Sequence, residues 1–146
     1  MIMDATLQLS NAQAITADAA STNVINLGAT GTAYGAAAAL VRDIGKGLGV
    51  PLVVTVTETF NNLTSMNVSI QVDDNSAFSS AKTVYRSPEY LLADLVIGKT
   101  FLLPDSLPVG TDEQYVRLFY DITGTAPTLG KVTAGVVMSR QTNTNR

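Results

Sequence analysis

Alternation of apolar and polar residues constrains this chain more than any other feature of its sequence. The clearest case is the run 66–73, where four apolar residues alternate with four polar ones. The runs 52–57, 115–122 and 132–138 follow the same period of two. Successive side chains of a β-strand point to opposite faces, so this period predicts strands with one buried face. Thr and Val are frequent in these runs, and β-branched residues suit a pleated, half-buried surface.

Shorter segments complete the secondary-structure prediction. Weaker strands are predicted at residues 5–9, 22–27, 82–85 and 100–103. Segments rich in Asp, Asn, Gly and Pro separate the strands, as turns require. Residues 36–41 predict one or two turns of helix, and residues 88–95 predict another, because Ser87-Pro88-Glu89 resembles a helix start. About eight short strands with little helix predict an all-β chain, a single β-sandwich or jelly-roll-like domain over residues 1–146.

One internal segment is expected to lie outside the sheets. Residues 28–39 consist of Gly, Ala, Thr and one Tyr, which predicts a long loop between strands that becomes ordered on assembly. Its glycines do not have the spacing of a phosphate-binding loop, and no strand–helix unit follows them. The uncharged stretch 19–41 is long enough to cross a bilayer, but it is too rich in Gly, Thr and Asn for a membrane helix.

The two ends of the chain are predicted to extend from the domain. Residues 1–20 form a candidate N-terminal arm. Within it Ala5, Leu7 and Leu9 alternate but lack an evident partner strand, so we predict that residues 1–10 pair with a neighbouring molecule. The polar tail 141–146 is predicted to fray.

Composition excludes several kinds of chemistry. The chain has 146 residues and contains no Cys, His or Trp. Thiolate nucleophiles, Ser–His–Asp triads and imidazole metal ligands are therefore excluded. The net charge of −3 argues against a nucleic-acid partner, which normally needs a basic face. Asp4 stands where a signal peptide would have basic residues, so we expect the chain to remain in the cell that makes it or in a particle assembled there.

The carboxylates give no catalytic or metal-binding pattern. The acidic residues 73–74 begin like a calcium loop, but the later ligands of such a loop are missing, and a hairpin turn explains them better. Glu58 falls on the apolar side of its strand, where the strand is expected to end in solvent. The sequence thus predicts no catalytic, cofactor-binding or metal-ligating residue, no cofactor and no small-molecule substrate, and we do not expect an enzyme.

Six residues are candidates for a contact with a partner or another subunit. Tyr115, Arg117 and Phe119 lie on the face of their strand that should be polar, and Arg with aromatic residues is typical of interface cores. The equally weighted alternative buries both faces of this strand in one sandwich, with the Arg117 side chain extending to solvent. The other candidates are Leu7 and Leu9 in the predicted arm and Tyr34 in the predicted loop.

Several segments, in order along the chain, resemble small capsid decoration (cement) proteins of the Bordetella-phage type. The matching segments are TLQLSNAQAITA (6–17), STNVINLG (21–28), RDIGKG (42–47), PLVVTV (51–56), DNSAFSS (74–80), YVRLFY (115–120), GTAP (124–127) and GKVTAGVV (130–137). Together they span most of the chain. The segment 29–41 is longer than the corresponding link of that family, which affects any contact that the link makes.

The resemblance implies a jelly-roll-like fold, a homotrimer and a place on the outer surface of a tailed-phage head. There the chain would bind the major capsid protein and tie neighbouring capsid subunits together, after synthesis in the cytoplasm of the bacterial host. The alternative is a carbohydrate- or receptor-binding β module of a phage spike or fibre. The lack of Trp and the small number of Tyr residues weigh against such a binding module.

Overall fold

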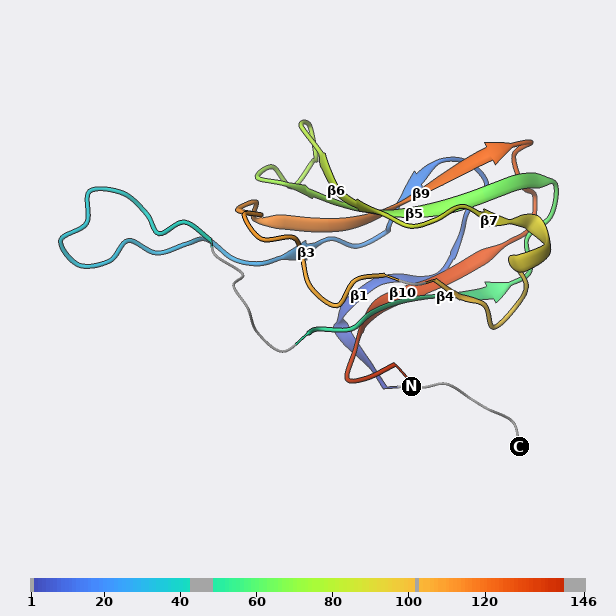
Figure 1. Cartoon of the computed structure of the whole chain (residues 1–146), viewed down its shortest axis with the longest axis horizontal. Helices are drawn as coiled ribbons and strands as arrows, with labels where there is room; N and C mark the ends of the chain where they lie inside the picture. The colour runs from blue at the N-terminus through green and yellow to red at the C-terminus, as the bar shows by residue number, and fades with distance from the viewer. Residues whose placement is uncertain (1, 43–48, 102, 141–146) are drawn as a thin grey trace.

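The computed structural model describes residues 2–42, 49–101 and 103–140, and the predicted tail 141–146 lies outside them. Two antiparallel sheets face each other (Figure 1). The first sheet has the order β1 (Met3–Ala14), β10 (Lys131–Val137), β4 (Leu52–Glu58), β8 (Thr100–Phe101). The second has the order β2 (Ala19–Ala20), β9 (Tyr115–Gly124), β5 (Leu63–Asp73), β6 (Lys82–Arg86), with β3 (Ile25–Asn26) on β9 and β7 (Tyr90–Leu91) on β5. The all-β prediction is confirmed.

The core lies between the two sheets, and the alternating runs supply it. The fully buried large side chains include those of Met66, Val68, Ile70, Leu118 and Tyr120 in the second sheet. Val54, Val56, Phe101 and Val132 face them from the first sheet. The rings of Tyr90 and Phe101 meet edge to face, with centroids 4.7 Å apart. Apolar burial of this kind is the main favourable contribution to folding.

The N-terminal segment is an edge strand of its own domain. β1 pairs antiparallel with β10 of the same chain, from Met3↔Val137 to Ala14↔Lys131. The expectation that residues 1–10 need a neighbouring molecule as strand partner is therefore wrong for β1, because alternation alone does not show which strand lies beside it. The register shifts three times along this pair. Such bulges protect an exposed edge from pairing with other chains.

Segment 15–27 closes the side of the sandwich beside β1. The side chain of Gln13 links the two sheets: its Oε1 accepts from the Thr22 N–H at 2.9 Å, and its Nε2 donates to the Ala20 carbonyl at 2.8 Å. Asn23 then donates from its backbone to the Leu9 carbonyl at 2.9 Å and from its side chain to the Gln8 carbonyl at 2.9 Å. The outer edge of β1 is therefore partly covered by the chain itself.

Both predicted helices are wrong or much reduced. Residues 36–41 contain no helix, although Ala favours one. A run this short cannot offset the cost of helix nucleation without a packed face. In the region 88–95 the structure has only β7 and a 3-10 turn, Leu92–Asp94. The Ser87 hydroxyl does not cap a helix, because it accepts from the Val68 N–H at 2.9 Å and donates to the Pro88 carbonyl.

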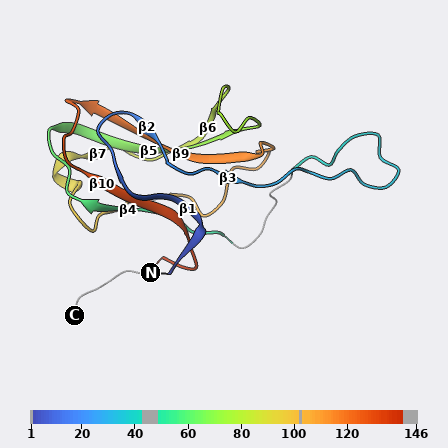
Figure 2. The ribbon, with the colours of Figure 1, turned by 180° about the vertical axis from the view of Figure 1, so that it is seen from behind.

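The predicted loop is confirmed and is the most prominent feature outside the sandwich. Residues 27–42 leave β3 and extend as a long hairpin-like excursion beyond the end of the two sheets (Figures 1 and 2). We call this segment the projecting loop.

Candidate interaction surfaces

The two ends of the projecting loop are held together at its base. The guanidinium group of Arg42 donates to the carbonyls of Leu27, at 3.1 Å, and Gly28. The backbone N–H of Arg42 donates to the Asp112 carboxylate. Farther out, the N–H of Leu40 donates to the Gly31 carbonyl at 2.9 Å. The base is thus fixed by a charged side chain and ordinary backbone contacts, although sequence reasoning gave Arg42 no role.

A second group of contacts joins this base to the second sheet. The Leu27 N–H donates to the Gln114 carbonyl at 2.9 Å, and Gln114 Nε2 donates to Asn26 Oδ1 at 2.9 Å. Gln114 directly precedes β9, so the loop is anchored to a central strand of the sandwich. This anchoring sets the direction in which the loop leaves the body.

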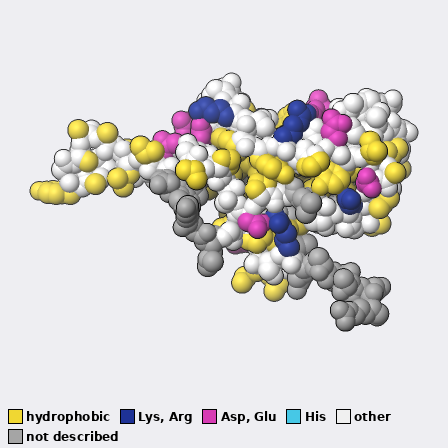
Figure 3. Space-filling model, in the orientation of Figure 1, with side chains coloured by type: hydrophobic (Ala, Val, Ile, Leu, Met, Phe, Trp, Pro, Cys, Tyr) yellow, Lys and Arg dark blue, Asp and Glu magenta, His cyan; other side chains and the backbone are white. Residues whose placement is uncertain are grey.

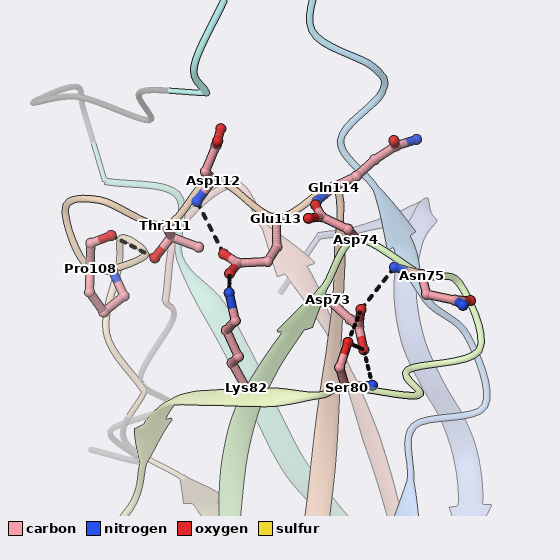
Figure 4. Close-up of polar contacts among 10 residues, drawn as sticks. All are labelled: Asp73, Asp74, Asn75, Ser80, Lys82, Pro108, Thr111, Asp112, Glu113 and Gln114. Carbon is pink, nitrogen blue, oxygen red and sulfur yellow. Dashed lines mark hydrogen bonds and ion pairs between the residues drawn. The ribbon is translucent and has the colours of Figure 1, made fainter.

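Beside the base lies a cluster of polar side chains at the end of β5, β6 and β9 (Figure 4). Lys82 forms an ion pair with Glu113, and the hydrogen bond from Lys82 is the main reason that the pKa of Glu113 lies below its usual range. The same partner raises the pKa of Lys82. The charges of Lys82 and Glu113 thus compensate each other within the chain, and their ion pair supports the structure beside the base of the loop.

The β5–β6 hairpin in this cluster is stapled by Asp73. Its carboxylate accepts from the Asn75 N–H at 2.9 Å and from the Ser80 N–H at 2.7 Å (Figure 4). These hydrogen bonds, that from Asn75 first, lower the pKa of Asp73. The prediction of a hairpin turn at residues 73–75 is therefore confirmed. In the described ranges, no group of three or more Asp and Glu side chains is arranged to hold a metal ion.

Tyr115, Arg117 and Phe119 lie together on the outer face of the second sheet, each half-buried. The Arg117 guanidinium lies over the ring of Phe78, 4.1 Å from its centroid, and its Nε donates to Gln71 Oε1 at 2.8 Å. Burial lowers the pKa of Arg117. In the part of the chain that the structure describes, no further sheet covers this face, and Phe78 of the chain's own β5–β6 hairpin packs on Arg117. The polar groups of this face are therefore partly paired within the chain, and its side chains remain partly exposed.

The other candidate residues are not brought together. Leu9 is fully buried in the core of its own domain and is unavailable to a partner, so its place among the interface candidates is a correction. Leu7 is half-buried in β1. Tyr34 is fully exposed at the far part of the projecting loop, far from the Arg117 face in sequence and connected to it only through the base. Glu58 ends β4 in an ion pair with Lys131 at 2.6 Å, as expected for a strand end facing solvent.

Sequence reasoning missed an apolar surface at the end of the sandwich opposite the loop. Its exposed members are Leu91, Val96, Ile97 and Leu129, and we call this surface the apolar end. The Ile97 N–H donates to Thr59 Oγ1 at 3.1 Å, which holds the residue beside the β4–β5 turn. Leu91 ends β7, Val96 and Ile97 follow the 3-10 turn, and Leu129 lies between β9 and β10, so no shared periodicity in the sequence marks them as a group.

No helix in the described part of the chain has the length and apolar character needed to span a membrane. A family model described as Bbp16 matches residues 9–136. The chain belongs to the Bbp16 family. Bbp16 is a Bordetella-phage protein family name, and membership supports a phage protein associated with the virion. The match includes both sheets and the projecting loop, but not the first residues of β1. No curated protein matches the sequence.

Proposed function

We propose that this Bbp16-family chain is a structural decoration protein on the outer surface of a tailed-phage head. It binds the major capsid protein and stabilises contacts between neighbouring capsid subunits. The expected oligomer is the homotrimer that the sequence resemblance implies. Family membership supports a phage structural protein, and the proposal adds its place and its role.

The observation that carries the proposal is a β-sandwich with an anchored projecting loop, in which residues 27–41 carry no charge. Long loops without secondary structure are uncommon in compact domains and usually have a function. This loop contributes nothing to the core, since its residues from 29 to 41 are exposed or half-exposed. Its role is therefore to contact something other than its own domain, which is what an assembly protein requires.

The mechanism is adhesive. Each subunit presents several surfaces: the projecting loop, the Arg117 face and the apolar end. Joining subunits into an oligomer makes their weak contacts with the shell simultaneous, and linked contacts hold far more tightly than separate ones. Shell subunits bridged in this way resist the outward pressure of packaged DNA.

Co-sedimentation with phage heads tests this proposal. Purified chain is added to heads that lack it, and bound protein is measured after centrifugation through a sucrose cushion. We expect saturable binding and greater resistance of the heads to heating. No binding to heads, together with binding to glycans, would overturn the proposal in favour of a receptor-binding module.

A further inference from the structure

We propose that Arg117 is an anchor of this chain on the shell, where it binds a carboxylate side chain exposed on the major capsid protein. The inference rests on the proposed function and deepens it by naming the chemistry of one contact. Arg117 lies on the outer face of the second sheet between Tyr115 and Phe119, which are half-buried like Arg117 itself. Arg and aromatic side chains together are typical of the residues that dominate binding energy at interfaces.

The Arg117 guanidinium is held in place before a partner arrives. Its central carbon lies 4.1 Å from the centroid of the Phe78 ring and 6.0 Å from that of the Phe119 ring. Its Nε donates to Gln71 Oε1 at 2.8 Å. Among the described residues, its two terminal nitrogens have no hydrogen-bond acceptor and no ion-pair partner. They form a planar fork that matches the two oxygens of a carboxylate.

The β5–β6 hairpin places Phe78 against Arg117 through an unusual backbone conformation. Phe78 has a φ of 54°, in the left-handed region that a bulky residue rarely adopts. The turn fixes this conformation, since the Phe78 N–H donates to the Asn75 carbonyl at 2.9 Å, and the ring is 7% exposed. Strained backbone persists where the surrounding structure enforces it, and it is concentrated at functional sites. The fold thus maintains the ring on which Arg117 rests.

Most other positive charges of the body are compensated within the chain. Ion pairs with carboxylates hold Lys82, Arg86, Lys131 and Arg140. Figure 3 shows one side of the body, where basic and acidic side chains lie in adjacent groups. The Arg42 guanidinium is used at the base of the projecting loop, and Lys99 lies over the ring of Tyr90, 5.1 Å from its centroid. Among the described cations, Arg117 is therefore the one on the outer face of the second sheet without a charged partner.

The acidic groups near Arg117 are already bound elsewhere. Burial lowers the pKa of Arg117, and the charge of Asp73 opposes this effect. The Asp73 side chain is buried, however, and its carboxylate accepts from two N–H groups of its own hairpin. Farther along β9, Asp121 is paired with Arg86. A carboxylate that docks on this face therefore meets one uncompensated positive charge, which is already partly removed from water.

The carboxylate is expected to come from a different protein rather than from a second copy. Apart from that of Asp94, every described carboxylate of this chain accepts a hydrogen bond or forms an ion pair within its own subunit. A nucleic acid does not fit either, because phosphate backbones are bound by several cations together. The proposed function makes the major capsid protein the partner, so the free carboxylate is assigned to its outer surface.

Binding of variants to heads that lack the protein tests the anchor. Arg117→Gln should bind at least about tenfold more weakly than wild type, because it truncates one partner of a desolvated charge pair. Arg117→Lys should not restore binding, since an ammonium group lacks the fork. Wild-type affinity should also fall more steeply with ionic strength than that of Arg117→Gln. Melting temperatures of the free variants show that each one folds.

The matched control is Lys99→Gln. It removes the same charge from another cation that lies over an aromatic ring, directly before β8 of the first sheet. We expect Lys99→Gln to bind heads as wild type does. A loss equal to that of Arg117→Gln would assign the effect to net charge and overturn the inference.

Amidation of the heads tests the partner's side of the contact with wild-type protein. Heads are treated with a water-soluble carbodiimide and glycinamide, which convert exposed carboxylates into neutral amides, and the reagents are removed before binding. Wild-type affinity should fall to that of Arg117→Gln, whose own affinity should change little, because the two changes remove the same interaction. Equal fold losses for both proteins would overturn the inference.

The remaining outcomes separate this inference from the proposed function. Equal binding of wild type and Arg117→Gln to untreated heads would reject the anchor and leave the decoration role standing. Heads that do not bind wild type would reject both. Weaker self-association of both Arg117→Gln and Asp94→Asn in sedimentation velocity would show that a second copy supplies the carboxylate, and it would overturn the inference.

Discussion

The hydroxyl group of Tyr120 links the two sheets, and removing it should show how much this buried hydrogen bond contributes to the free energy of unfolding. Tyr120 is fully buried in β9, and its hydroxyl lies 2.8 Å from Ser10 Oγ in β1. Ser10 Oγ also donates to Gln13 Oε1 at 2.7 Å. Since a Ser hydroxyl has one proton, Tyr120 must be the donor in the contact between the sheets.

This donor assignment makes the two deletions unequal. Tyr120→Phe removes one neutral hydrogen bond and leaves Ser10 bonded to Gln13, so it should cost about 0.5–1.5 kcal/mol. Ser10→Ala leaves the buried Tyr120 hydroxyl without its acceptor, which should cost about 1–3 kcal/mol. The double variant should lose less than the sum of the two, because the second deletion then removes a group that is already unpaired.

Urea unfolding followed by far-UV circular dichroism, at one protein concentration, gives the three free energies of unfolding. An equal or larger cost for Tyr120→Phe than for Ser10→Ala would refute the donor assignment. Additive costs in the double variant would refute the inter-sheet link itself.

The same hydroxyl predicts a pH dependence. Burial raises the pKa of Tyr120 above its ordinary value, because the apolar core disfavours the charged phenolate. The neutral phenol therefore stabilises the fold fully at pH values below the unfolded pKa of about 10. This stabilisation falls as the pH rises further, because the unfolded chain then releases the proton while the folded chain keeps it. Wild type should lose stability between pH 9 and pH 11 more steeply than Tyr120→Phe, and equal slopes would contradict the argument.

Three further predictions concern the core, the hairpin and the loop. Phe101→Ala should lower the free energy of unfolding by about 3–5 kcal/mol in urea, because the ring is fully buried against Tyr90; a loss under 1 kcal/mol would refute the packing. Asp73→Asn should lower the melting temperature at pH 7. The difference in melting temperature from wild type should shrink as the pH falls through the lowered folded pKa of Asp73, because protonation of the carboxylate removes its stabilising contribution from wild type. A difference that stays constant with pH would contradict this prediction. Arg42→Ala should speed chymotrypsin cleavage after Tyr34 without changing the melting temperature, and unchanged cleavage would show that Arg42 does not fix the base.

The central strands were predictable because burial of one face against the core determines their residue pattern. In β5 and β9, residues such as Val68 and Leu118 face the core and alternate with residues on the other face of the sheet, several of which are also buried in β5, so period two survives in the sequence. The same holds for β10 and for β4. The sheet that a strand joins, by contrast, depends on contacts between segments far apart in the chain, which periodicity does not encode.

The edge of the sandwich shows where the sequence pattern fails. In β1 the bulges break the register, and Ala12 takes a left-handed conformation with φ of 45°, which its residue type does not suggest. As a result Leu9 and Ser10 are both buried, although adjacent strand residues normally face opposite ways. For the same reason Leu9 was wrongly included among the candidate interface residues, since it belongs to the core.

The loop was half predictable. Its Gly- and Ala-rich composition indicates a loop, but its extension away from the body follows from the contacts of Arg42 and Gln114. The residues that these two side chains contact are distant from them in the sequence, and no sequence motif marks the pairs. The apolar end is a similar case, since Ile97 and Leu129 are held by Thr59 and Asn61, which are distant from them in the sequence.

The most direct test of the decoration role is cryo-electron microscopy of heads from the phage that encodes this chain, with and without the protein. The account predicts density for the β-sandwich outside the shell, touching more than one capsid subunit, and its loss from heads that lack the chain. Shells with identical outer surfaces in both preparations, or density for the sandwich only in a tail spike or fibre, would contradict it.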